Sequence, residues 1–202
     1  MKPWLGVCAL LGGGAAAVAA ASGFIGTWDH LSAHLLAWDA KYWLREPWTL
    51  WTAAWVHSAG GNLAGNLLAL LAVAIVGASL RVGRAAALAL LVAWPLATLG
   101  LQLWPALGGY HGLGGPLHAA VMVLWGHVAW RSELKPLSTV LFFAMALKLL
   151  LEKAWLQPVA FDPSWGFNVI YAAHLTGAGA GAVCGLVAGA WCASRESAAP
   201  AP

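Results

Sequence analysis

The chain has 202 residues, of which 61% are apolar and 8% are charged. A soluble domain carries about 25% charged residues, so the composition excludes an ordinary soluble enzyme and predicts an all-α integral membrane protein, with one domain over residues 1–195. The formal net charge of +3 is small and dispersed, which argues against nucleic acid as a partner. The expected partner is the lipid bilayer.

The first apolar run covers residues 3–23. It is long enough for a transmembrane helix that stays in the protein, and we prefer this interpretation because the charge distribution described below requires it. The alternative remains open, because Lys2, the apolar stretch and Ala19-Ala20-Ala21 are also typical of a cleavable signal peptide.

Residues 24–61 differ from the rest of the chain because tryptophans alternate there with charged and histidine side chains. These residues are Trp28, Asp29, His30, His34, Trp38, Asp39, Lys41, Trp43, Arg45, Glu46, Trp48, Trp51 and Trp55. Tryptophan with scattered charge is typical of the membrane–water interface. We expect short helices and turns that lie in the interface plane.

Five further apolar runs follow, at residues 62–80, 85–107, 114–130, 136–155 and 169–192. Six spans in all place both ends of the chain on one side of the membrane. That side then holds six basic residues: Lys2, Arg81, Arg84, Arg131, Lys135 and Arg195. The opposite side holds three: Lys41, Arg45 and Lys153. The positive-inside rule therefore predicts cytoplasmic termini, and residues 196–202 form a short tail that we expect to be disordered.

Residues 108–118 carry five glycines and a proline where a helix would be expected. Pro116 suits the first turn of a helix, so the fourth span should begin near Gly114. A helix over residues 114–130 is roughly 25 Å long, short of the ~30 Å hydrocarbon core. The glycine-rich backbone would then lie at membrane depth, where it is tolerated only if it is buried or lines a cavity.

The last apolar run carries four glycines spaced four residues apart, namely Gly177, Gly181, Gly185 and Gly189. On a helix they form one stripe that lets another helix approach closely. His174 precedes this stripe by one turn. An ionisable residue inside the membrane is a candidate functional residue, although a histidine that is hydrogen-bonded for packing is the alternative.

Two polar pairs are spaced by four residues inside apolar runs. Lys148 and Glu152 can form an ion pair that lowers the cost of membrane insertion, which favours a structural role. Asn62 and Asn66 share a helix face and could point into a common cavity, whereas Asn62 could instead be the N-cap of its helix.

Several of these residues match a known pattern in order along the chain. They are Trp48-Thr49-Leu50-Trp51-Thr52, His57, Asn62-Leu63-Ala64-Gly65-Asn66, Gly112-Leu113-Gly114-Gly115, Lys148 with Glu152, and Ala173-His174 before the glycine stripe. Together they resemble the rhomboid family of intramembrane serine proteases, specifically its bacterial rhombosortase branch, over most of residues 48–189.

The resemblance implies a rhomboid-type bundle of six transmembrane helices in the bacterial inner membrane. It implies a serine nucleophile at the position of Gly114, activated by His174 as base without a third carboxylate. It also implies oxyanion donors at Asn66 and at Asn62. Substrates would be membrane-anchored proteins with C-terminal Gly-Gly-type anchor segments, and neither a cofactor nor a metal is implied.

Three positions depart from the family pattern: Gly114 replaces the serine, Asn62 replaces a histidine, and Thr49 replaces an arginine. Glycine has no nucleophile. We therefore expect a catalytically impaired homologue, a pseudoprotease that still binds transmembrane segments.

Three alternatives remain. An active serine endopeptidase could use another nucleophile, such as Ser58 or Thr176, or a recruited water. A small transporter or channel could use the polar cavity, although no inverted repeat supports it. A metal could be held by His111, His118 and His174, but no carboxylate or cysteine joins them in the sequence pattern.

Overall fold

The computed structural model describes residues 1–22, 35–163 and 166–197, and the protein is mostly helical, at 73%. The long helices are α1 (Lys2–Ala21), α4 (Gly60–Ser79), α5 (Arg84–Leu99), α6 (Gly114–Val128), α7 (Lys135–Glu152) and α8 (Tyr171–Ser197). Among the described residues, five helical segments are long and apolar enough to cross a membrane. The chain is therefore compatible with a membrane protein.

Helix α6 is the long helix that does not meet this criterion. It begins at Gly114, as Pro116 predicted, and has 15 residues, which corresponds to a length of about 22 Å. The expectation of a short fourth helix is confirmed. The expectation of six spanning helices is not, since the described part of the chain contains five.

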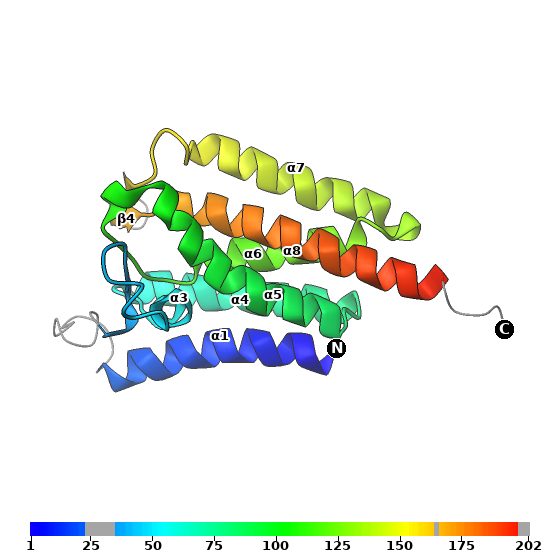
Figure 1. Ribbon diagram of the computed structural model, residues 1–202, viewed down its shortest axis with the longest axis horizontal. Helices are drawn as coiled ribbons and strands as arrows, with labels where there is room; N and C mark the ends of the chain where they lie inside the picture. Colours follow the sequence, from blue (N-terminus) through cyan, green and yellow to red (C-terminus); the bar gives the residue numbers. More distant parts are fainter. Residues whose placement is uncertain (23–34, 164–165, 198–202) are drawn as a thin grey trace.

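The helices run side by side, with α6 and α8 packed together and α7 on the outside (Figure 1). The start of α1 and the end of α8 lie at the same end of the bundle (Figure 1). Helix α1 packs on α4 and α5 and buries Trp4, Leu11 and Ala15 completely. This burial supports a first helix that stays in the protein.

The glycine stripe of α8 faces α6, which confirms the predicted close approach of another helix. A methyl group added at Gly185 would lie 2.7 Å from the Cα of Val123, and one added at Gly181 would lie 2.6 Å from the Cα of Ala119. Both distances are shorter than real carbon contacts allow. The two helices therefore touch backbone to backbone, and only glycine fits at these positions of α8.

The segment before α4 consists of short elements, as expected for residues 35–61. Helix α3 (Thr49–Thr52) and the 3₁₀ turn η1 (Ala53–Trp55) follow a series of turns. Strand β1 (Trp38–Asp39) pairs with β2 (Gly109–Tyr110), which the all-α prediction missed. The predicted interfacial residues Trp28, Asp29, His30 and His34, and the tail from residue 198, lie outside the described residues.

The other connections are also short. The predicted third span ends earlier than expected, because α5 stops at Leu99 and continues as the 3₁₀ turns η2 (Gly100–Leu103) and η3 (Pro105–Leu107). The turn η4 (Ser132–Leu134) leads into α7, and the antiparallel strands β3 (Ala160–Asp162) and β4 (Phe167–Val169) lead into α8.

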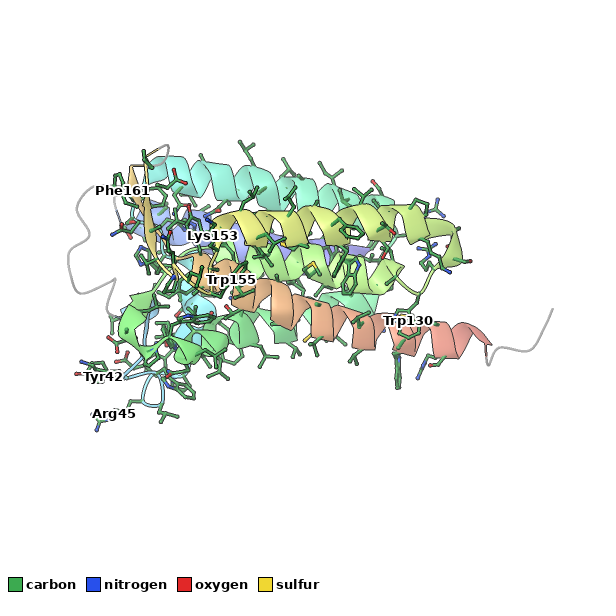
Figure 2. All side chains as sticks on the ribbon, turned by 90° about the horizontal axis from the view of Figure 1, so that it is seen from above. Tyr42, Arg45, Trp130, Lys153, Trp155 and Phe161 are labelled. Carbon is green, nitrogen blue, oxygen red and sulfur yellow. The ribbon has the colours of Figure 1, made fainter. Side chains whose placement is uncertain are left out.

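Polar and aromatic side chains gather at the two ends of the bundle. Figure 2 shows Tyr42, Arg45 and Lys153 toward one end and Trp130 toward the other. Between the ends, α7 exposes a row of large apolar side chains: Val140, Phe143, Leu147 and Leu151. An apolar band between polar and aromatic ends is the pattern of a helix bundle that sits in lipid.

Candidate functional site

The glycine-rich turn before α6 is fixed by main-chain bonds. Strand pairing joins Tyr110 to Trp38, and the N–H of Gly112 donates to the carbonyl of Ala53 at 2.8 Å. Gly112 has a φ of +114°, a backbone conformation that glycine adopts without strain. The turn therefore has one defined shape and delivers the start of α6 into the bundle.

The buried hydroxyl of Tyr110 bridges this turn. It donates to the carbonyl of Gly112 at 2.6 Å and accepts from the N–H of Gly115 at 3.0 Å. Burial raises the pKa of the Tyr110 phenol, which keeps the hydroxyl protonated and able to donate. The bridge occupies the Gly115 donor, and Pro116 has no N–H. The start of α6 thus offers fewer free donors to an oxyanion than the sequence implied.

Gly114 and His174 lie next to each other across α6 and α8. A β-carbon added at Gly114 would lie 2.9 Å from Nε2 of His174 and 3.1 Å from its Cδ2. The close approach of Gly177 to the backbone of Gly115 brings the two helix ends together. The structure therefore places the predicted nucleophile position and the predicted base side by side.

Glu152 joins His174 at the end of α7. Its carboxylate oxygens lie 2.9 and 3.0 Å from Nδ1 of His174. It also pairs with Lys148, as the i, i+4 spacing predicted. The resemblance implied that the base His174 has no carboxylate partner. The contact with Glu152 corrects that expectation. A carboxylate in an apolar helix is itself a functional signal. The sequence had suggested for Glu152 only an ion pair with Lys148.

His118 completes the group from α6. Its Nδ1 lies 2.7 Å from the carbonyl of Gly114, and its ring stacks on that of His174 with centroids 4.1 Å apart and planes 15° apart. His118 therefore lies on the same face of α6 as Gly114.

The two asparagines form a network with His57. Nδ2 of Asn66 donates to Oδ1 of Asn62 at 2.8 Å and lies 3.1 Å from Nε2 of His57. Both N–H groups of Asn66 are thus engaged, which leaves the amide of Asn62 as the donor in this pair that is free to turn to a ligand. Asn62 is not the N-cap, because α4 begins at Gly60 with Ala59 as its cap.

The other candidate residues divide between the cavity and the core. Nε2 of His111 lies 3.3 Å from Oγ of Ser58, and both residues are exposed and line a cavity. Thr49 is buried and donates to the carbonyl of Glu46 at 2.6 Å. Thr176 packs against Gly100. Neither threonine lines the cavity that holds Gly114 and His174.

A cavity of about 620 Å³ lies between α4, α6, α7 and α8. Gly114, His118 and His174 line it, together with Asn62 and Asn66. Its size falls in the range of ligand sites in proteins. All four predicted site residues therefore line this one cavity: Asn62, Asn66, Gly114 and His174.

Comparison with known proteins adds no family. No protein-family model matches the chain, and no curated protein sequence matches it. The geometry of the cavity therefore carries the functional argument.

Proposed function

We propose that the chain is a rhomboid-like membrane protein of the rhombosortase type whose protease site lacks its nucleophile. In this proposal it binds membrane-anchored C-terminal segments of other proteins in the cavity and does not cleave them efficiently. The observation that carries the proposal is the contact between Gly114 and His174.

The distances at this contact suit a serine–histidine pair. With a β-carbon 2.9 Å from Nε2 of His174, a serine hydroxyl at residue 114 would be within hydrogen-bond reach after a shift of the ring by a few tenths of an ångström, since such pairs work at ~2.6–3.2 Å. Glu152 holds Nδ1 of the same ring, the role of the third group in a triad. With glycine, no acyl-enzyme can form at residue 114.

The cavity suits a chain segment that enters from the lipid. It is lined in part by residues of α4 and α7, and α7 buries little of its surface in the bundle. Glu152 of the site directly precedes Lys153, which lies toward the same end of the bundle as Arg45 (Figure 2). With six basic residues at the opposite end, the positive-inside rule supports cytoplasmic termini in a bacterial inner membrane.

The test of the site is Gly114→Ser. A fluorophosphonate probe should label purified Gly114→Ser protein and leave the native chain, Gly114→Ala and the double variant Gly114→Ser/His174→Ala unlabelled. Replacing Glu152 by Gln in the Gly114→Ser background should slow labelling by roughly 10²–10⁴-fold, because the ring loses its orienting carboxylate. A folded Gly114→Ser protein that stays unlabelled even after Asn62 is changed to His contradicts the proposal.

The test of client binding is photo-crosslinking from the cavity. A crosslinking amino acid at Ala69, an exposed residue of α4 that lines the cavity, should capture peptides with a C-terminal transmembrane anchor. The matched control is Leu71 on the same helix, which is exposed but lies outside the lining. Equal capture from both positions would mean that clients do not use the cavity.

A second candidate function rests on the contact between Ser58 and His111. Their side chains lie 3.3 Å apart in the lining of the same cavity, so Ser58 could act as a non-standard nucleophile of an active endopeptidase. This candidate predicts that the probe labels the native chain and that Ser58→Ala abolishes the labelling.

A further inference from the structure

Three metal-ligand side chains converge from three helices in the part of the chain that the structure describes. They are His118 of α6, Glu152 at the end of α7 and His174 of α8, and their ligand atoms all lie within 4.8 Å of one another. From this geometry we propose that His118, Glu152 and His174 bind a divalent transition-metal ion of the zinc type. This metal-site proposal does not rest on the proposed binding of membrane-anchored clients.

The donor set fits such an ion. Two imidazoles and one carboxylate, with a fourth position left for water, form a common zinc ligand set. Donors around a tetrahedral ion with bonds of ~2.0–2.2 Å lie roughly 3.3–3.5 Å apart. The present distances run from 2.9 Å, between Glu152 and His174, up to 4.8 Å. Closing the set therefore requires shifts of about an ångström per side chain and a rotation of one imidazole, because the His118 and His174 rings now stack with planes 15° apart and their nitrogen lone pairs lie in those planes.

The surroundings also favour binding over an open surface cluster. The side chains of Glu152 and His174 are only 11% and 13% exposed, and His118 is 9% exposed. His118 is anchored by the Gly114 carbonyl, the kind of outer contact that orients ligating histidines. The adjoining cavity supplies a path for the ion and a place for its water.

Lys148 competes with the ion. Its ammonium pairs with Glu152 and is the cation that balances the carboxylate in the structure as it stands. The Lys148 side chain is 48% exposed, so it has room to swing away when a metal ion arrives. Removing this ammonium should strengthen metal binding, which a merely structural cluster would not predict.

The experiment uses the full chain in detergent, stripped with a chelator and dialysed against Co²⁺ or Zn²⁺. We expect one ion per chain, with a visible Co²⁺ absorption band of tetrahedral type. His174→Ala, Glu152→Gln and His118→Asn should each weaken binding at least tenfold, and Lys148→Met should tighten it. His118→Asn retains a donor for the Gly114 carbonyl, which protects the fold.

His111→Ala is the matched control, because His111 lines the same cavity but bonds to Ser58. Its affinity for the ion should equal that of the native chain. The proposal is overturned if the folded native chain binds no Co²⁺ or Zn²⁺ at millimolar concentration. It is also overturned if His118→Asn binds as tightly as the native chain, or if Lys148→Met binds more weakly. None of these outcomes depends on Gly114→Ser labelling, so the proposed function can fail separately.

Discussion

The contact between α6 and α8 makes a quantitative prediction for Gly185→Ala. The added methyl would lie 2.7 Å from the Cα of Val123 and 2.8 Å from its carbonyl oxygen. Both partners are backbone atoms, so no side chain can turn aside, and α8 must move away from α6. Overpacking of this kind costs roughly 1–3 kcal/mol.

The matched control is Gly179→Ala on the same helix, where an added methyl meets nothing within 4 Å. Glycine-to-alanine exchange favours a helix by up to about 1 kcal/mol, and this gain applies to both variants. The difference between them therefore isolates the packing cost. We expect Gly185→Ala to be less stable than Gly179→Ala by about 1–3 kcal/mol.

The assay is reversible unfolding of the purified chain in mixed micelles with increasing sodium dodecyl sulfate, followed by far-ultraviolet circular dichroism. The transition of Gly185→Ala should shift to lower detergent fractions, and that of Gly179→Ala should stay in place or shift upward. Equal midpoints for the two variants would refute the close approach of α6 and α8.

Three further predictions concern single residues. Burial lowers the pKa of His57 from 6.5 to about 4. Between pH 6.5 and 4 the unfolded chain therefore binds more protons than the folded chain. The free energy of unfolding falls as pH drops through that window, by up to about 3 kcal/mol. His57→Gln should remove this part of the pH dependence of unfolding. Gly112→Ala should destabilise by about 1–2 kcal/mol, because its φ of +114° is strained for other residues, and an unchanged unfolding midpoint would contradict this. Gly14→Ala should destabilise in the same unfolding assay, because the added methyl lies 2.6 Å from Cδ1 of Trp55; Gly13→Ala, which meets nothing within 4 Å, should not.

The helices and half of the site could be predicted from local patterns. Apolar runs bounded by charge located the long helices, and Pro116 fixed the start of α6. The glycine stripe predicted which face of α8 meets another helix, and the position of His174 followed. Each of these features follows from a periodicity or a residue type within a single helix.

The contacts that depend on how elements approach each other could not be predicted in this way. Glu152 reaches His174 because the end of α7 lies beside the start of α8, and nothing in either helix specifies that neighbour. The pairing of β1 with β2 involves two residues from each strand, too few for an alternating pattern. Asn62 looked like a cap because the two glycines before it are poor helix formers, yet α4 starts at Gly60.

The bridge made by Tyr110 has a consequence for how this site can change. The hydroxyl joins Gly112 to Gly115 and passes over residue 114 without using its side chain. The bridge therefore does not depend on the side chain at that position. Exchange between glycine and serine there alters the chemistry and leaves this bridge in place, and the His174 ring, which an added β-carbon would approach to 2.9 Å, is the part of the site that must shift.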